Sequence, residues 1–208
     1  QLGYNPNIKD VFSKYSLKSS YKAKYMIDAG LSIFNNNTAI DRFKGRMIFP
    51  IHSFSGRILG FGGRNLKTDK KAKYINSPES LIYIKSKILY GIYFAKQYIS
   101  KQNNCYVVEG YTDVISLHQA GIENVVSSSG TALTTEQIKL LNRFTENITI
   151  LFDGDLAGLK ASFRSIDMIL SEGMNVKVIL FPDGEDPDSY AQKCTQQELE
   201  NFLKTNSK

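Results

Sequence analysis

The sequence has few of the residues that build disulfides, zinc sites or membrane spans. Its 208 residues include two cysteines, two histidines and no tryptophan. Two cysteines, Cys105 and Cys194, are too few for a disulfide framework or a cysteine-rich zinc site. We therefore expect both to be small buried residues in a reducing compartment.

Long apolar runs are also missing. No run approaches the roughly 20 residues that a membrane helix needs, and the start has no signal-peptide pattern. We therefore expect a cytoplasmic protein without a membrane partner. Because residue 1 is Gln and not Met, we also expect the chain to be a fragment of a longer protein.

Acidic residues are scarce in the first half of the chain. Residues 1–104 carry 18 lysines and arginines against 5 acids, whereas residues 105–208 carry 8 against 15. Five acids cannot pair with eighteen cations, so most cations of the first half lack an internal partner. Such a half can be a solvated surface, and it equally suits a partner that carries phosphate, while the acidic half suits bound cations.

The first half predicts a mixture of helices and strands. Residues 1–40 have the spacing of short helices that stop near Gly30, and Ser55-Gly56 predicts a turn between two later strands. The expected strands are 46–51, 57–63 and 73–79, and 89–100 is expected to be a linking helix.

From residue 105, continuous apolar segments alternate with amphipathic ones. This rhythm predicts a parallel sheet covered by helices on both faces. The fold class is therefore α/β, with an α+β basic subdomain at 1–104, a boundary near 100–104, and a Rossmann-like parallel-sheet domain at 105–208. The expected strands of that sheet are 105–109, 124–128, 148–152 and 175–181, and the main helices are 111–120, 134–144 and 156–173.

Carboxylates follow three of these strands. In a parallel sheet the carboxyl ends of the strands meet at one edge, where ligands bind. Taken singly, Asp155 and Asp188 are ordinary helix-capping residues, and Asp153-Gly154 is ordinary turn chemistry. The whole set is Glu109, Asp153, Asp155, Asp183, Glu185, Asp186 and Asp188, with Asp113 one helical turn after Glu109.

Converging carboxylates repel each other unless a cation neutralises them. Oxygen ligands suit Mg²⁺ or Mn²⁺, and the lack of a histidine among them argues against zinc. A carboxylate-held metal beside a basic half predicts phosphate-ester chemistry on nucleic acid, with Glu109 as the candidate for proton transfer.

Two motifs together resemble the Toprim domain, which bacterial primases share with type IA and type II topoisomerases and some nucleases. They are "VVEGYTDV" (107–114) and "LFDGDLAG" (151–158). Residues 41–66, "KYINSPES" (73–80) and "KILYGIYFAK" (87–96) are similar to the stretch that precedes Toprim in DnaG-type bacterial primases. "SSGTALT" (128–134) and "FPDGEDPDSY" (181–190) also match that family.

The resemblance implies roles for individual residues. Glu109 would be the catalytic acid or base and would also touch metal, with Asp153 and Asp155 completing the catalytic set. Lys44 stands where the family usually has Arg, which loses a bidentate fork. The implied metal residues are Glu109, Asp113, Asp153, Asp155, Asp186 and Asp188, and the implied nucleic-acid and nucleotide residues are Arg42, Lys44, Arg46, Arg64, Lys73, Asn76 and Lys85. From the residues alone, Arg46 and Arg64 could instead pair with local acids such as Asp41.

The function implied is a DNA-templated RNA polymerase that makes short RNA primers on single-stranded DNA for replication, from ribonucleoside triphosphates with Mg²⁺ or Mn²⁺. The family's zinc-binding domain and its region for the replicative helicase would lie outside this chain, so no zinc is expected here. Two alternatives stay open: another Toprim enzyme, such as a topoisomerase or nuclease, and a catalytically silent nucleic-acid-binding module. A topoisomerase would need a tyrosine nucleophile on a separate DNA-gate domain.

Overall fold

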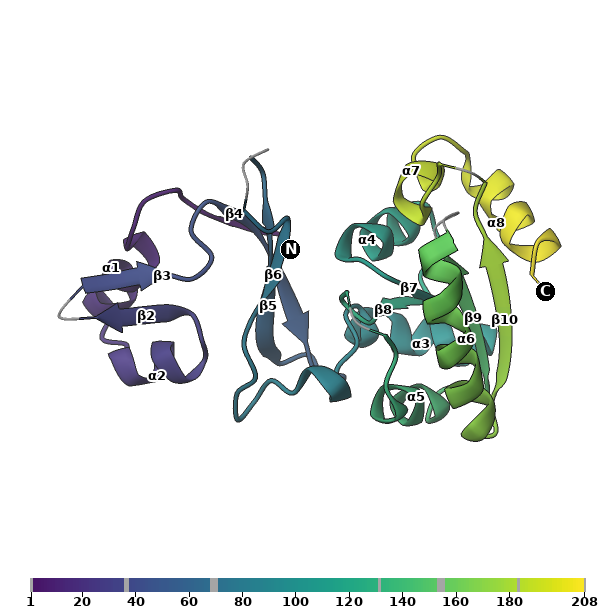
Figure 1. The fold of residues 1–208 in the computed structure, drawn as a ribbon, viewed down its shortest axis with the longest axis horizontal. Coiled ribbons are helices and arrows are strands. Elements are labelled where there is room, and N and C mark those ends of the chain that lie inside the picture. Colours follow the sequence, from purple (N-terminus) through teal and green to yellow (C-terminus); the bar gives the residue numbers. More distant parts are fainter. Residues whose placement is uncertain are drawn as a thin grey trace. The chain divides into compact units, whose positions relative to one another are not determined.

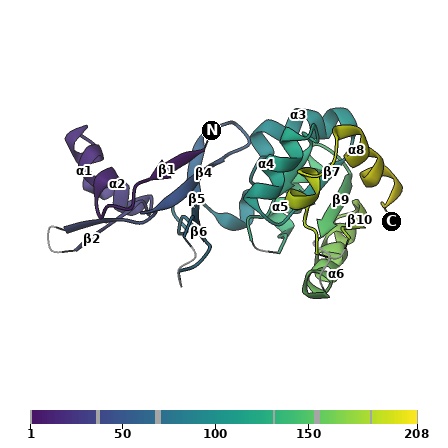
Figure 2. The same ribbon diagram turned by 90° about the horizontal axis from the view of Figure 1, so that it is seen from above.

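The structure is a computed structural model, drawn in Figure 1 and, turned by 90°, in Figure 2. It describes residues 2–35, 38–67, 71–130, 132–152, 156–182 and 184–207, with side chains omitted for 156–163. The chain divides into two compact units. The first is Gln1–His52 with Arg57–Lys85, and the second is Ser86–Lys208 with the short turn Ser53–Gly56.

The first unit combines a four-stranded antiparallel sheet, a two-stranded ribbon and a pair of short helices. The sheet order is β1-β4-β5-β6. The ribbon pairs β2 with β3 (Figure 1). The elements are β1 (Gly3–Asn5), α1 (Val11–Lys18), α2 (Ala23–Asp28), β2 (Ser32–Asn35), β3 (Thr38–Asp41), β4 (Arg46–His52), β5 (Ile58–Asn65) and β6 (Tyr74–Asn76).

The expected strands 46–51, 57–63 and 73–79 are confirmed as β4, β5 and β6, with Gly56 at φ +91° in the turn between β4 and β5. The prediction that residues 1–40 contain only helices is wrong. Strands β1, β2 and β3 are three or four residues long and mostly exposed. Short exposed strands are held by backbone pairing, so they show no alternation of apolar side chains.

Helix α2 ends where the sequence predicts. Gly30 adopts φ +64°, its N–H donates to the Ile27 carbonyl at 2.8 Å, and the Leu31 N–H donates to the Met26 carbonyl at 2.9 Å. This is the Schellman arrangement that satisfies the last carbonyls of a helix. A Cβ atom at residue 30 would lie 2.2 Å from the Pro78 ring, so glycine is required by space as well as by conformation.

Helix α1 begins without a cap of its own. Asp10 occupies the N-cap position but makes no side-chain capping bond. Instead the buried Asp41, at the end of β3, accepts hydrogen bonds from the N–H of Phe12 at 2.7 Å and of Ser13 at 3.0 Å. It also accepts the Ser13 hydroxyl at 2.5 Å. A negative charge is thus placed at the positive end of the helix by a distant part of the chain.

The second unit contains a parallel sheet of order β10-β9-β7-β8. Its strands are β7 (Cys105–Val108), β8 (Val125–Ser127), β9 (Asn147–Phe152) and β10 (Asn175–Leu180). Its helices are α3 (Ile92–Gln102), α4 (Tyr111–Gln119), α5 (Thr135–Asn142), α6 (Leu156–Ser171), α7 (Pro187–Ala191) and α8 (Gln196–Thr205).

Both faces of this sheet are covered, as predicted. Val107 of β7 packs in a core with α3, α5 and α6, whereas its neighbour Val108 packs in a second core with α4, α7 and α8. Successive residues of a strand point to opposite faces. The two cores are therefore the two sides of one sheet.

Residues 86–104 pack with the parallel sheet. The Thr134 hydroxyl donates to the Ser86 carbonyl at 2.5 Å, and the Gln137 amide donates to the Ile88 carbonyl at 2.8 Å. Ile92 and Ile99 of α3 belong to one of the sheet's cores. Packing thus divides the chain after Lys85, whereas the division into domains at 1–104 and 105–208 stays a prediction.

The two cysteines are both free thiols. Cys105 is fully buried in the central strand β7, as predicted, and burial raises the pKa of its thiol. Cys194 is only half-buried, which corrects the expectation for that residue. In the part of the chain that the structure describes, no helix combines the length and apolar character needed to cross a membrane.

Candidate active site and cationic residues

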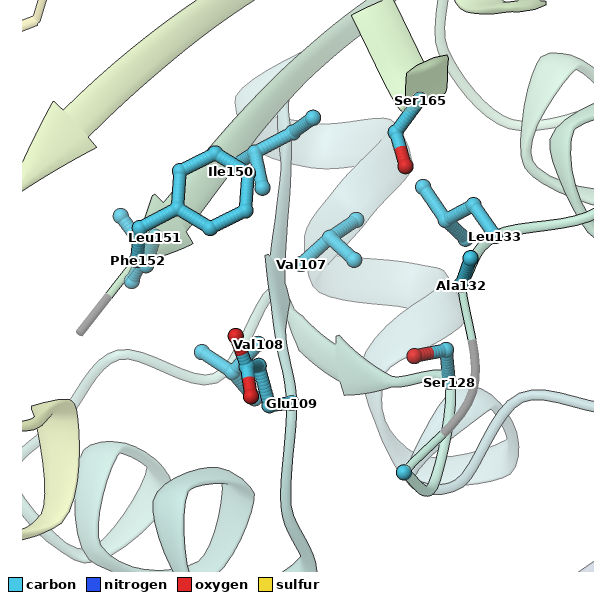
Figure 3. Close-up of a pocket in the computed structure, with 11 residues that line it drawn as sticks. Val107, Val108, Glu109, Ser128, Ala132, Leu133, Ile150, Leu151, Phe152 and Ser165 are labelled. Atoms are coloured by element: carbon cyan, nitrogen blue, oxygen red, sulfur yellow. The ribbon is translucent and has the colours of Figure 1, made fainter. Parts of the chain in front are cut away.

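The carboxyl ends of the parallel strands form the edge that the sequence singled out. Strand β7 ends at Val108, opposite Ser127 of β8, and Glu109 follows it. A pocket of about 220 Å³ opens at this edge, with mainly apolar walls. Figure 3 shows the Glu109 carboxylate at one end of the pocket and the Ser165 side chain at the other.

Hydrogen bonds fix the backbone around Glu109. Its carbonyl accepts the Ser127 hydroxyl at 2.7 Å and the Gly130 N–H at 3.1 Å, while the Ser129 N–H donates to the Ser127 hydroxyl at 2.8 Å. Ser129 and Gly130 both have positive φ, at +61° and +81°. This sharp turn returns the chain toward the pocket, where Ser128 lies on the wall.

Asp113 supports the same segment from helix α4. Its Oδ2 accepts the N–H of Gly110, the N-cap residue, at 2.8 Å, and its side chain is buried. A carboxylate at this third helical position is the reciprocal half of a capping box. Asp113 therefore has a structural role, because its carboxylate holds the start of α4 directly after Glu109.

Asp186 and Asp188 both belong to the start of helix α7. Asp186, and not Asp188 as the sequence suggested, is the cap, since its Oδ1 accepts the Ser189 N–H at 2.6 Å. Asp188 Oδ1 accepts the Ser116 hydroxyl at 2.5 Å and the Gln192 amide at 2.6 Å, which joins α7 to α4. The side-chain bonds of both aspartates within the described chain end on Oδ1, so each keeps its Oδ2 for another ligand.

Glu185 is already engaged. It accepts hydrogen bonds from Lys193 and, at 2.6 Å, from the Ser189 hydroxyl. The bond from Lys193 is the main cause of a lowered pKa at Glu185, followed by that from Ser189. Asp153, Asp155 and Asp183 lie outside the described residues.

The carboxylates of Glu109, Asp186 and Asp188 supply oxygen donors of the kind that a hard divalent cation prefers. They do not form a complete set by themselves. Within the described part of the chain, no three histidine, cysteine, aspartate or glutamate side chains lie close enough together to hold a metal ion.

Arg46 is the most buried of the implied cationic residues, at 7% exposure. Its Nη1 donates to three carbonyls, of Gly63 at 3.1 Å, Ala72 at 2.9 Å and Lys73 at 3.3 Å. The alternative that Arg46 pairs with Asp41 is wrong, because Asp41 caps α1 instead. The guanidinium therefore fastens the loop between β5 and β6 to β4.

The other residues of this group are distributed over the sheet and its connections. Arg64 lies over the Tyr74 ring at 5.8 Å, and the strand register places Arg64 and Asn76 on the same face. Lys73 is exposed just before β6, and the Lys85 N–H donates to Glu79 Oε1 at 3.0 Å.

Arg42 and Lys44 lie in the turn between β3 and β4. The Arg42 Nε is buried and has no hydrogen-bond partner among the described residues, while the Lys44 N–H donates to the Asp41 carbonyl at 3.3 Å. An unpaired buried guanidinium N–H is costly unless a ligand satisfies it. Arg42 is thus a reasonable position for an anion.

Two hydroxyls of the pocket were not predicted. Ser128 comes from the turn after β8, and Ser165 is 6% exposed on helix α6. Ser165 precedes the buried Ile169 by four residues, so both lie on the apolar face of that helix. A serine on the apolar face of a helix was the sequence signal that could have identified Ser165 as a residue of the pocket.

Known proteins resemble the chain along nearly its whole length. The family profile described as DNA primase catalytic core, N-terminal domain, matches residues 1–96, and the one described as Toprim-like matches residues 106–191. The DNA primase of Halalkalibacterium halodurans is 44% identical over 195 residues, which cover 93% of this chain and 32% of that protein. The chain spans about a third of the length of these curated relatives.

Solved structures agree with these matches. The RNA polymerase domain of Mycobacterium tuberculosis primase DnaG superposes with a TM-score of 0.91 at 34% identity, covering 99% of this chain and 70% of that one. A DnaG primase catalytic domain bound to single-stranded DNA superposes with a TM-score of 0.87 at 38% identity, covering 98% and 66%.

Proposed function

Because this chain belongs to the DnaG-type DNA primase family, we propose that it is part of a catalytic core that makes short RNA primers on single-stranded DNA. The observation that supports this most directly is the position of Glu109 at the carboxyl edge of a parallel sheet, beside a pocket. A similar DnaG domain that was solved with single-stranded DNA supports the choice of template.

We propose that the reaction is nucleotidyl transfer. The 3′ hydroxyl of the growing primer attacks the α-phosphate of a ribonucleoside triphosphate, and pyrophosphate leaves. Glu109 accepts the proton of the attacking hydroxyl. A bound Mg²⁺ or Mn²⁺ would neutralise charge on the phosphoryl oxygens. The residues proposed to hold the ion are Glu109, Asp153, Asp155, Asp186 and Asp188, with Asp113 orienting the backbone next to Glu109.

The basic residues are proposed to bind the phosphates of template and nucleotide. Arg46 would act partly through the loop that it fastens, because its Nη1 is committed to carbonyls. The residues proposed for direct contact are Arg42, Lys44, Arg64, Lys73, Asn76 and Lys85. The replicative helicase is a proposed partner of the longer protein.

Ribonucleotide incorporation on single-stranded DNA tests the proposal. Wild-type chain should incorporate ribonucleotides with Mg²⁺ or Mn²⁺, and Glu109→Gln should lower the rate by about 100-fold or more, as expected for loss of a general base. Asp153→Ala and Asp155→Asn should also be inactive, and all three variants should still bind single-stranded DNA. Glu146→Gln, an exposed carboxylate of the same unit, is the matched control.

Retained synthesis in both Glu109→Gln and Asp153→Ala would refute the proposed site. Relaxation of supercoiled plasmid, or metal-dependent nicking, would indicate another Toprim enzyme. Calorimetry that detects no Mg²⁺ or Mn²⁺ binding dependent on Asp153 and Asp155 would instead favour a silent binding module.

A further inference from the structure

Three tyrosines of the α1–α2 pair expose most of their side-chain surface, although their rings are largely apolar. Tyr15 is 71% exposed, Tyr21 65% and Tyr25 61%. All three lie within eleven consecutive residues, on α1, on the connection and on α2. Rings this exposed gain little from the fold itself, and exposed aromatic side chains close together in the sequence are candidates for a binding site.

Lysines alternate with these rings. Lys18, Lys22 and Lys24 are all exposed, and none of them is within salt-bridge distance of an acid among the described residues. Residues 11–27 contain no acidic residue. Lys14 differs, since it pairs with Asp10 at 3.2 Å. Three lysines without an acidic partner in the described part of the chain thus accompany three exposed rings.

The backbone that carries the rings is held in one conformation. Ser20 adopts φ +66°, its N–H donates to the Leu17 carbonyl at 3.1 Å, and the Tyr21 N–H donates to the Ser16 carbonyl at 3.0 Å. This Schellman motif fixes the path of the chain at Tyr21. A surface that is already ordered loses less entropy when a ligand binds.

We propose that Tyr15, Lys18, Tyr21, Lys22, Lys24 and Tyr25, called here the tyrosine–lysine surface, bind single-stranded nucleic acid. Rings on which bases stack, interleaved with cations that meet phosphates, are the combination by which proteins hold single strands without reading sequence. A protein partner fits less well, because lysine is depleted in protein interfaces. The surface is additional to the basic residues of the sheet, and it rests on the proposed function only for the class of its ligand.

Fluorescence anisotropy with a labelled single-stranded dT oligonucleotide, on the 208-residue chain, tests the proposal. Tyr15→Ser/Tyr25→Ser should weaken binding about tenfold or more, and Tyr15→Phe/Tyr25→Phe should restore it, because phenylalanine also stacks. Lys18→Gln/Lys22→Gln should reduce the slope of log K against log salt by about 1.4, or ~0.7 for each phosphate contact of a single strand. Lys101→Gln/Lys177→Gln makes the same charge change on exposed residues of the second unit and should leave the slope as it is.

Unchanged affinity in the Tyr→Ser pair, or an equal change of slope in both lysine pairs, would overturn the inference. Loss of self-association in sedimentation without loss of DNA binding would also overturn it and indicate a protein interface. Wild-type chain that makes primers while the tyrosine pair binds DNA normally would refute this surface and leave the proposed function standing. Circular dichroism checks that the variants are folded, which is expected because every substituted side chain is exposed.

Discussion

The two units bury their apolar side chains to very different degrees. The second unit places its parallel sheet between two layers of helices, and most of the largest fully buried side chains belong to it, including Leu117 and Ile138. Most of the large apolar side chains that are exposed in the described chain belong to the first unit, such as Leu81 at 99% exposure. The second unit therefore has the larger interior, and the first unit presents more apolar surface for contact.

The same substitution in each unit should give the largest contrast. Leu117→Ala removes a fully buried side chain of α4 and should lower the free energy of unfolding by about 3–5 kcal/mol. Leu81→Ala should change it by less than about 0.5 kcal/mol. Urea denaturation followed by circular dichroism measures both. Similar losses would mean that the first unit also has a packed interior at Leu81.

The start of helix α1 in the first unit is held by the buried carboxylate of Asp41. Asp41→Asn replaces a carboxylate that accepts three hydrogen bonds and should destabilise this unit by about 2–3 kcal/mol. Amide hydrogen exchange should accelerate at Phe12 and Ser13. Asp28→Asn, at an exposed position of the same unit, should leave that exchange unchanged. Protection that persists in Asp41→Asn would show that α1 does not need its distant cap.

A local cap in the second unit should matter less. Thr195 caps α8 by accepting the Glu198 N–H, and Glu198 in turn accepts the Thr195 N–H. Thr195→Ala should cost about 1 kcal/mol. Thr205→Ala, at the other end of α8, is the control and should cost less. Thermal unfolding measures both, and a loss as large as that of Asp41→Asn would remove the distinction between local and distant caps.

The smallest expected effect concerns pH and the first unit. Burial is the main cause of a lowered pKa at His52, from an ordinary value of 6.5. The fold therefore favours the neutral imidazole, so its contribution to stability is complete above pH 6.5 and is lost as the pH falls toward the lowered pKa. His52→Gln should flatten the decline in stability that begins as the pH falls below 6.5, and an unchanged decline would contradict it.

The sequence predicted the second unit well because its signals are local. Val107 and Val108 point into different cores because successive residues of a strand face opposite sides of the sheet. Thr134 and Thr195 begin helices with capping boxes whose two partners are only three positions apart. The first unit lacks such signals. Its helix α1 is capped by Asp41, 28 residues beyond Ser13, and its missed strands have few buried side chains. Contacts between distant residues leave no periodic pattern.

The candidate site could also be predicted from the sequence only where its signals are local. The place of Glu109 followed from the rule that strand ends meet at one edge. The carbonyl partners of Arg46 could not be predicted, because they depend on how the loop before Lys73 folds back. Asp186 and Asp188 were recognised as a pair, but which of them caps α7 depends on the helix starting at Pro187.

Cys105 gives the parallel sheet an intrinsic kinetic probe. Its thiol is fully buried in β7, which lies between β8 and β9, and burial raises its pKa. An alkylating reagent reacts with the thiolate, which burial disfavours. The reagent also needs access to the sulfur, so Cys105 can react only while the structure around β7 is open. At high reagent concentration, the rate of Cys105 modification becomes the rate of the opening that exposes β7, so this opening can be timed at a thiol that the chain already carries.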